Sequence, residues 1–366
     1  MTVGVAILGS TGSIGTCALR VLERHPDRFR VVALTSHTSV DALARQAAAV
    51  GAPFSGSVTA DGPDCLVEAA THPDADIVIN AVVGAVGLEA TLAALEGGKR
   101  VALANKESLV MAGELVMGAA ARGGGEIIPI DSEHSAVLQC ISGHPAAVAR
   151  LILTASGGPF RDWPADRVRG ATVAEALRHP TWRMGRKITV DSATLANKAL
   201  EVIEAHFLFG LAYEAIDAVV HPQSIVHGFV EFVDGSILAQ MGYPSMELPI
   251  LYALTHPDRV PDAGVRRYDP VAAGTLTFEP VRPEAFPTFA LGVAAGRAGG
   301  TAPAVFNAAN EVAVAAFLTG RITFGRIPEL IDSALSSHAP ERAESLGTVT
   351  LADRWARAHT EAETAP

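Results

Sequence analysis

The first strand and turn of the chain, V-G-V-A-I-L-G-S-T-G-S-I-G at residues 3–15, indicate its fold. Residues 3–8 are the apolar run of a buried parallel strand, and apolar periodicity predicts a helix over residues 16–24. A strand, a glycine-rich turn and a helix in this order are typical of a dinucleotide-binding unit, because glycines let backbone N–H groups approach a pyrophosphate. The spacing is GxxGxxG and not GxGxxG, so an ordinary tight turn of a parallel α/β domain is the alternative.

The second predicted strand, residues 29–34, is followed by T-S-H-T-S at residues 35–39. A site that prefers NAD usually has an acidic residue here for the ribose 2′-hydroxyl, and the first acid in this region is Asp41. Hydroxyl groups together with His37 suit a 2′-phosphate better than a carboxylate would, so the sequence favours NADP. No arginine lies at this strand end.

Two further strands of the same sheet are predicted at residues 75–83 and 100–104, and the second leads directly into N-K-E, Asn105–Glu107. Residues at the carboxyl ends of parallel strands face the ligand crevice in this class of fold. We therefore expect Lys106 to face a substrate, with a structural ion pair as the alternative.

Two acidic residues follow the next predicted strand, residues 127–130, in the sequence D-S-E-H. Asp131 and Glu133 are two positions apart, so in an extended or turning backbone both carboxylates point the same way. With Glu201 they offer three hard oxygen donors, which suit Mg²⁺ or Mn²⁺ rather than zinc. The alternative is a helix N-cap in which Asp131 or Ser132 caps the helix and the acids favour its dipole.

A second polar region lies between His179 and His206. Its second half predicts a short strand at residues 188–190 and then a helix capped by Asp191 or Ser192. Polar residues recur at spacings of three and four in that helix and form one stripe: Thr194, Asn197, Lys198, Glu201 and Glu204. The alternative is a solvated polar face without a function.

This region also has the composition of a ligand site. The helix start with Ser192, Asn197 and Lys198 is suited to a phosphate, and Trp182 and Met184 lie in a loop that can fold over a ligand. Only four of the 28 basic residues are lysines, which suggests that each lysine has a chemical reason. Upstream, Ser156 and two glycines follow a predicted strand at residues 151–154 and form a second candidate anion site.

The rest of the chain predicts antiparallel strands and then helices. Strands are predicted at residues 218–224, 226–233 and 236–241, with a hairpin at Asp234-Gly235. Residues 256–287 are rich in Pro, Gly and Arg, as expected of a linker. Four helices are then predicted, at residues 287–297, 302–318, 327–336 and 351–360.

The totals exclude several classes of protein. A chain of 366 residues is expected to form two or three domains, and 49% apolar residues supply ample cores. A net charge of −11 argues against a non-specific nucleic-acid binder. Three widely spaced cysteines predict no disulfide framework and favour a reducing cytoplasm. We expect neither a signal peptide nor a membrane span, because the first apolar run breaks immediately into Gly and Ser and no apolar stretch is long enough.

Together, six motifs closely resemble the 1-deoxy-D-xylulose 5-phosphate reductoisomerase family. They are G-S-T-G-S-I-G, A-N-K-E, D-S-E-H-S, S-G-G-P-F-R, the stretch from H-P-T-W-R-M-G to N-K-A-L-E, and H-P-Q-S-I-V-H-G-F-V-E-F-V-D-G-S, and N-A-A-N-E-V-A extends the match into the helical tail. The resemblance implies an enzyme that uses NADPH and Mn²⁺ or Mg²⁺ to rearrange and reduce its sugar phosphate substrate to 2-C-methyl-D-erythritol 4-phosphate, in isoprenoid precursor synthesis. It also implies a homodimer.

The resemblance implies roles for particular residues. The metal ligands would be Asp131, Glu133 and Glu201, and the catalytic residues Lys106, Glu133 and Glu201. The phosphate would be bound by Ser156, His179, Ser192, Asn197 and Lys198. Ser132 and Lys106 would contact the reacting hydroxyls, and Trp182 and Met184 would lie on a closing flap. The cofactor-binding residues would be Gly9, Thr11, Gly12, Ser13, Ile14, His37, Ser39, Asn105, Lys106 and Glu107. Family members often carry an Arg-containing or Gly-Lys-Asn-like run where this chain has His37, Thr38 and Ser39.

The fold class predicted from these observations is α/β. It comprises an N-terminal Rossmann-like parallel sheet domain (1–131), an α+β catalytic and dimerisation domain with antiparallel strands (132–256), a linker (257–286) and a C-terminal helical bundle (287–366). Two rival functions are open: a non-catalytic dinucleotide sensor, which does not need the three carboxylates, and a plain NADP dehydrogenase, which needs no metal.

Overall fold

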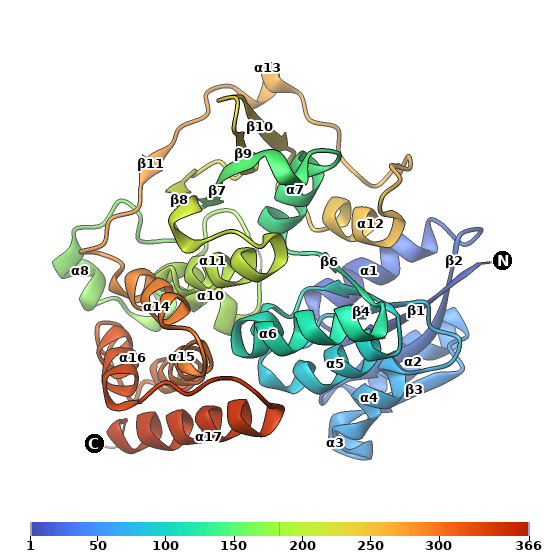
Figure 1. The fold of residues 1–366 in the computed structure, drawn as a ribbon, viewed down its shortest axis with the longest axis horizontal. Coiled ribbons are helices and arrows are strands. Elements are labelled where there is room, and N and C mark those ends of the chain that lie inside the picture. The colour runs from blue at the N-terminus through green and yellow to red at the C-terminus, as the bar shows by residue number, and fades with distance from the viewer. Residues whose placement is uncertain (1, 183, 365–366) are drawn as a thin grey trace. The chain divides into compact units, whose positions relative to one another are not determined.

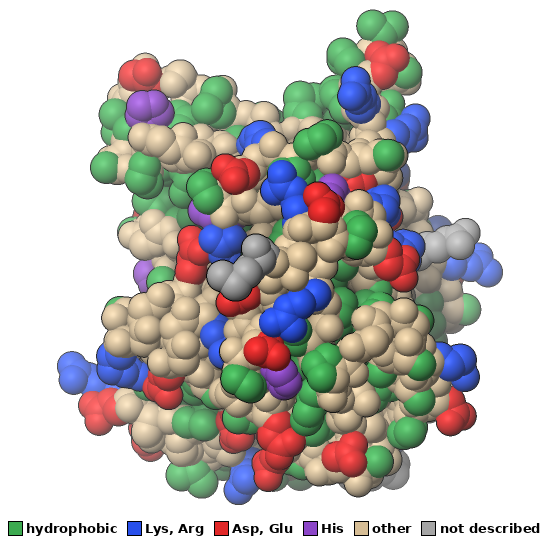
Figure 2. Space-filling model, turned by 90° about the vertical axis from the view of Figure 1, so that its right-hand side faces the viewer, with side chains coloured by type: hydrophobic (Ala, Val, Ile, Leu, Met, Phe, Trp, Pro, Cys, Tyr) green, Lys and Arg blue, Asp and Glu red, His purple; other side chains and the backbone are tan. Residues whose placement is uncertain are grey.

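The structure, a computed structural model, describes residues 2–182 and 184–364 and contains two compact units (Figure 1). Unit 1 comprises Met1–Ser108, Glu114–Leu138 and Ser245–Arg267, and unit 2 comprises Leu109–Gly113, Gln139–Pro244 and Tyr268–Pro366. No helix among the described residues combines the length and the apolar composition needed to cross a membrane. On the face drawn in Figure 2, acidic and basic side chains are interspersed rather than gathered by sign.

Unit 1 is built on a parallel sheet with the strand order β3-β2-β1-β4-β5-β6. The chain runs outward from β1 to β3 and then returns to the other side of β1, so a topological switch point lies between β1 and β4. This confirms the predicted Rossmann-like sheet. The strands are β1 (Val3–Leu8), β2 (Phe29–Ser36), β3 (Phe54–Ser57), β4 (Ile77–Asn80), β5 (Arg100–Leu103) and β6 (Glu126–Pro129).

Helices connect these strands, and their apolar faces bury the sheet. In α1, for example, Leu19 and Leu22 pack with Ile7 in one core. The helices are α1 (Ser13–Glu23), α2 (Val40–Val50), α3 (Val58–Asp61), α4 (Asp64–Ala70), α5 (Leu88–Glu96), α6 (Lys106–Gly123) and α7 (Ser132–Ile141). Two of them contribute residues to both units: α6, which is broken at Ala112, and α7.

A late segment of the chain returns to unit 1. Helix α12 (Glu247–Thr255) packs on α1, and Ile250 and Leu254 join the core of the parallel sheet. Beyond it, the Asp262 carboxylate accepts hydrogen bonds from Arg24 at 2.8 Å and pairs with His25 at 2.9 Å. Residues 245–267 are therefore part of the N-terminal unit, a return that was not predicted.

Unit 2 contains a mixed sheet with the order β10-β9-β7-β8-β11. Only β7 and β8 are parallel, and the other pairs are antiparallel, as the sequence predicted for this region. The hairpin at Asp234-Gly235 is confirmed: Gly235 has φ +84°, and Asp234 Oδ1 accepts from the Ser236 N–H at 2.9 Å. The strands are β7 (Val148–Ala155), β8 (Ile216–Val220), β9 (Val226–Phe232), β10 (Ile237–Met241) and β11 (Glu279–Pro280). The last of these, with α13 (Pro270–Ala273), lies within the segment predicted as a linker.

The predicted strand at residues 188–190 is wrong. These residues belong to α10 (Arg186–Thr194), which ends at Leu195 in the left-handed conformation, and α11 (Ala196–Phe209) follows at once. Asp191 and Ser192 therefore lie inside a helix and do not cap one. Ile188, Thr189 and Val190 have high strand propensity, but burial of the Val190 and Leu195 side chains in the core of unit 2 outweighs that preference.

The predicted C-terminal helices are confirmed. They are α14 (Pro287–Ala298), α15 (Ala302–Leu318), α16 (Arg326–Ser337) and α17 (Leu346–Glu363), the last of which begins five residues before the predicted start. Phe306, Phe317 and Ile331 from these helices pack in one core with Leu200 and Ile203 of α11. Two short helices, α8 (Ala165–Arg169) and α9 (Val173–Ala176), also belong to unit 2.

Candidate functional site

The glycine-rich turn of unit 1 has the geometry of a nucleotide-binding loop. Gly9 adopts φ +82°, and a methyl group on Gly15 would lie 2.4 Å from the Gly9 carbonyl oxygen, so only glycine permits this close turn. Helix α1 begins at Ser13, three residues earlier than predicted, and no side chain caps its N-terminus at Gly12. Backbone N–H groups near Thr11 and Ile14 are thus arranged to meet a pyrophosphate.

The end of β2 lies beside this turn. The backbone N–H groups of Gly9 and Ser10 donate to the Thr35 carbonyl at 3.1 and 2.8 Å. The residues that follow, His37 and Ser39, are exposed, and Ser39 precedes α2 as its N-cap. Their position beside the glycine turn fits the ribose end of a dinucleotide.

Asn105, Lys106 and Glu107 are buried at the carboxyl end of β5. The Asn105 side-chain amide donates to the carbonyls of Val82 and Gly84 at 3.1 and 2.9 Å and to Glu107 Oε2 at 3.1 Å. Asn105 therefore shapes the loop after β4 with its side chain.

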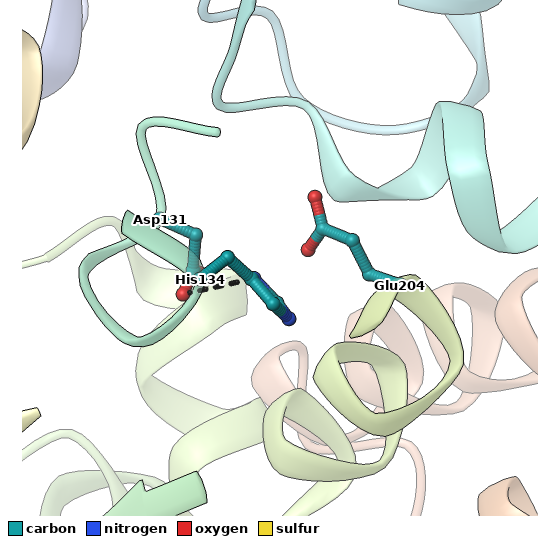
Figure 3. Close-up of side chains that lie close together, drawn as sticks. All are labelled: Asp131, His134 and Glu204. Atoms are coloured by element: carbon teal, nitrogen blue, oxygen red, sulfur yellow. Dashed lines mark ion pairs between the residues drawn. The ribbon is translucent and has the colours of Figure 1, made fainter. Parts of the chain in front are cut away.

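An acidic cluster lies at the carboxyl end of β6. Asp131 pairs with the Lys106 ammonium at 2.7 Å. It also pairs with Nδ1 of the buried His134 at 3.3 Å, the ion pair drawn as a dashed line in Figure 3. Its Oδ1 also accepts from the Glu133 N–H at 3.3 Å, and the Ser132 hydroxyl donates to the Glu133 carboxylate. The helix-start alternative for D-S-E-H is supported, because these residues lie at the start of α7 and Asp131 accepts the Glu133 N–H; metal binding by the two carboxylates stays a prediction. His134 was not among the predicted site residues, although its place three positions after Asp131 on a helix is a recognisable signal.

In unit 2, two serine hydroxyls meet one imidazole. Nε2 of His179 lies 3.0 Å from Ser156 Oγ and 3.1 Å from Ser192 Oγ. Its Nδ1 accepts from the backbone N–H groups of Thr181 and Trp182 at 3.1 and 2.9 Å. Since Nδ1 is an acceptor, the neutral ring carries its proton on Nε2 and points that donor toward the hydroxyls.

Burial holds this imidazole in the neutral form. Desolvation, with a smaller contribution from the positive charge of Arg161, lowers the pKa of His179 to about 4. At neutral pH the cluster of Ser156, His179 and Ser192 is thus uncharged and rich in donors. Such a cluster suits an anion that brings its own charge.

The polar stripe predicted on one helix is divided between two, because Thr194 ends α10 and the other four residues lie on α11. It is not a solvated face: Asn197 is half-buried and the rest of the stripe is buried. The Glu201 carboxylate accepts hydrogen bonds from Asn197 and from the Lys198 ammonium, and Glu201 is 1% exposed. Glu204, one turn further along, is also fully buried. Burial of a carboxylate is costly unless it is paired and hydrogen-bonded, and Asn197 and Lys198 supply such partners to Glu201.

The predicted flap begins at this histidine. Its Nδ1 fixes the backbone of Trp182, whose ring lies 6.5 Å from that of His227 in an edge-to-face arrangement. Met184 is half-buried, and Arg183 lies outside the described residues.

Each unit thus presents one part of the predicted site. Unit 1 holds the glycine turn, Lys106, Asp131 and Glu133, and unit 2 holds the cluster around His179 together with Lys198 and Glu201.

Comparisons with known proteins match the whole chain to one group. Sequence models described as 1-deoxy-D-xylulose 5-phosphate reductoisomerase match residues 5–59 and 52–113, and models of that enzyme's C-terminal domains match residues 127–209 and 241–359. The chain is 50% identical to the 1-deoxy-D-xylulose 5-phosphate reductoisomerase of Symbiobacterium thermophilum, over 98% of this chain and 97% of that protein. It is 52% identical to the one from Leifsonia xyli, over 96% of each chain.

Comparison with solved structures gives the same result as comparison of sequences. A crystal structure of DOX-P reductoisomerase in complex with NADPH, fosmidomycin and magnesium matches with a TM-score of 0.94 and 38% identity, over 99% of this chain and 98% of that one. The reductoisomerase of Zymomonas mobilis in complex with NADPH matches with a TM-score of 0.91 and 40% identity, over 100% and 99%.

Proposed function

The chain belongs to the 1-deoxy-D-xylulose 5-phosphate reductoisomerase family, and from this membership we propose its reaction and the residues that perform it. It converts 1-deoxy-D-xylulose 5-phosphate to 2-C-methyl-D-erythritol 4-phosphate with NADPH and a divalent metal ion, in the methylerythritol phosphate route to isoprenoid precursors. The observation that carries this conclusion is 50% identity to a reductoisomerase over 98% of the chain.

The cofactor is assigned to the carboxyl edge of the parallel sheet. Gly9, Gly12 and the N-terminus of α1 would bind the pyrophosphate, with Thr11, Ser13 and Ile14 in the same turn. His37 and Ser39 would meet the ribose 2′-phosphate, and Asn105–Glu107 would lie along the nicotinamide half. The exposed residues that follow β2, beside the glycine turn, support this assignment. Bound NADPH supplies the hydride for the reduction step.

The metal ion is assigned to Asp131, Glu133 and Glu201. All three offer the hard oxygen ligands that Mg²⁺ and Mn²⁺ prefer, and among the described residues no cysteine joins this group. Asp131 pairs with Lys106, and Glu201 pairs with Lys198 inside unit 2. When bound, such an ion polarises a carbonyl and lowers the pKa of an adjacent hydroxyl. The assignment requires both units to supply ligands to one cation.

The substrate phosphate is assigned to Ser156, His179, Ser192, Asn197 and Lys198. The neutral imidazole donates through Nε2, the serines donate through their hydroxyls, and Lys198 supplies positive charge. Anchoring the phosphate provides binding energy remote from the reacting carbons, and that energy orients them.

The remaining residues act at the reacting end of the substrate. Ser132 and Lys106 would donate hydrogen bonds to its hydroxyls, so Lys106 serves as both the ion-pair partner of Asp131 and a catalytic contact. Trp182 and Met184 would close over the bound substrate and exclude water.

NADPH consumption tests this function. We expect oxidation of NADPH only when 1-deoxy-D-xylulose 5-phosphate and Mg²⁺ or Mn²⁺ are both present, and loss of the activity in EDTA. Glu201→Gln is expected to reduce turnover by a factor on the order of 10³ or more, whereas Glu214→Gln, on the surface of unit 2, should leave it unchanged. Activity that survives EDTA would indicate a metal-free dehydrogenase, and NADPH binding without turnover would indicate a sensor.

We also propose a homodimer that works in the cytoplasm. Edge strand β10 exposes Ile237 and Leu238, each about half accessible, and a second copy that covers them would remove an unpaired apolar edge. Three free cysteines fit a reducing compartment. Light scattering of the purified protein should give twice the chain mass, and Leu238→Lys should shift it toward the monomer.

The functional domains predicted from the sequence are a different division of the chain from the two compact units. We propose that residues 1–131 bind NADPH and that residues 132–256 carry the catalytic and dimerisation functions. Residues 257–286 form the linker to the C-terminal helical domain, residues 287–366.

A further inference from the structure

One buried polar pair joins the C-terminal helices to the predicted phosphate site. The Asn310 side-chain amide on α15 donates to Asp191 Oδ1 on α10 over 2.9 Å, although the two residues are 119 positions apart in the sequence. The other carboxylate oxygen of Asp191 pairs with the Lys187 ammonium at 2.8 Å. Asp191 is 1% exposed and Asn310 is fully buried.

Packing alone does not require this pair. Val305, Phe306 and Val314 show that α15 is otherwise an apolar helix in the core of unit 2, and an apolar residue at position 310 would be the simpler way to fill that space. A buried carboxylate costs more free energy than an apolar contact unless it is fully hydrogen-bonded. The pair adds a geometric constraint, because a directional hydrogen bond fixes the position of α10 relative to α15 more narrowly than apolar contacts do.

The residue after Asp191 is Ser192, whose hydroxyl lies 3.1 Å from His179 Nε2. The turn that carries Ser156 also packs against this point of α10, since a methyl group on Gly158 would lie 2.6 Å from the Ser192 carbonyl oxygen. A shift of α10 would therefore disturb the Ser156, His179 and Ser192 cluster on two sides.

We propose that Asn310 is a positioning residue for the substrate phosphate. Through Asp191 it holds α10 in the place that lets Ser192, His179 and Ser156 act together on one anion. This inference rests on the proposed function, and it gives the C-terminal helices a part in substrate binding.

Helix α15 offers a matched control. Asn307 is also fully buried, but its amide donates to Glu311 at 3.1 Å, and Glu311 in turn accepts from Arg357 of α17. Asn307→Ala thus removes the same group from the same helix and leaves the hydrogen bond to α10 in place. Steady-state kinetics of wild type, Asn310→Ala and Asn307→Ala are measured together with NADPH dissociation constants and thermal unfolding.

We expect Asn310→Ala to raise KM for 1-deoxy-D-xylulose 5-phosphate by about tenfold or more, with a smaller change in kcat and an unchanged NADPH dissociation constant. Asn307→Ala should keep the wild-type KM. Equal KM values in the two variants, or a loss confined to kcat, would overturn the positioning role. If Asn310→Ala does not fold, Asn310→Ser, which keeps a short hydroxyl, is expected to show a smaller rise in KM. An inactive wild-type protein would instead contradict the proposed function itself.

Discussion

The four lysines of the chain differ in what their ammonium groups contact. Lys99 donates to the backbone carbonyls of His72 and Ala75 at 2.5 and 2.7 Å, and Lys187 pairs with Asp191. Lys106 and Lys198 instead pair with Asp131 and Glu201, two of the proposed metal ligands. The scarcity of lysine therefore does mark residues with specific partners, but only two of those partners belong to the proposed chemistry.

Single residues of the site could be named from local sequence patterns, but only the family resemblance grouped them. Ser156 follows a strand, His179 begins a loop and Ser192 lies in a helix, so no spacing rule connects them. The sequence also could not show whether the polar stripe of α11 is solvated, since periodicity reveals a face and not what covers it. The family resemblance identified these positions, and the structure supplies the tautomer and the burial.

The first prediction concerns the proton of His179. Because Nδ1 accepts two backbone N–H groups, we expect the Nε2–H tautomer at pH 7 and a pKa of about 4. His221 is a control of opposite sense: its Nδ1 lies 2.8 Å from the Thr277 carbonyl, and its Nε2 accepts from the Ile225 N–H, so it should be the Nδ1–H tautomer. Nitrogen-15 NMR of labelled histidine in the free protein distinguishes the two. Titration of His179 with a midpoint above pH 6 would contradict this account.

At the scale of elements, the parallel sheet was predictable because buried strands read as continuous apolar runs. The region of α10 was not, because local strand propensity and tertiary burial disagree there and burial decides. Helix α1 begins earlier than predicted, because the glycine turn is tight enough to start the helix at Ser13.

The second prediction tests that turn. Gly15→Ala would place a methyl group 2.4 Å from the Gly9 carbonyl oxygen, so the loop must open and NADPH binding should weaken by about tenfold or more. Gly51→Ala is the control, because Gly51 ends α2 at φ +65° and has open space around its Cα. That variant should lose roughly 1 kcal/mol of stability and keep its NADPH affinity. Fluorescence titration measures the NADPH affinity of both variants. Equal affinities would show that the turn does not bind the cofactor.

At the scale of the whole molecule, the order of the chain does not match its compact units. Arg24 and Asp262 are 238 positions apart, and nothing in their local sequence indicates that they meet. Apolar periodicity predicts helices such as α15 but not which core they enter, and it did not predict α12. Long-range pairing of this kind is what sequence reasoning about one chain cannot supply.

The third prediction concerns this return segment. Burial would raise the pKa of Asp262, but hydrogen bonds from His25, the Gly264 N–H and Arg24 outweigh it and lower that pKa. Asp262→Ala should therefore destabilise unit 1 by about 2–3 kcal/mol at pH 7, whereas Asp258→Ala, in the exposed part of the same segment, should change little.

The lowered pKa of Asp262 determines how its contribution to stability changes with pH. A carboxyl with a lowered folded-state pKa stabilises the protein above its unfolded pKa and loses that contribution as the pH falls through the folded value. The difference in urea stability between wild type and Asp262→Ala should narrow below about pH 4. A difference that stays constant would show that Asp262 acts without its charge.

The central claim is that carboxylates from both units bind one cation. Mn²⁺ binding to the NADPH-loaded protein, followed by electron paramagnetic resonance, tests it most directly. We predict that Asp131→Asn, Glu133→Gln and Glu201→Gln each weaken Mn²⁺ binding by at least about tenfold, while Glu214→Gln binds as the wild type does. If Asp131→Asn and Glu133→Gln weaken binding but Glu201→Gln does not, the ion is held by unit 1 alone and the account is contradicted.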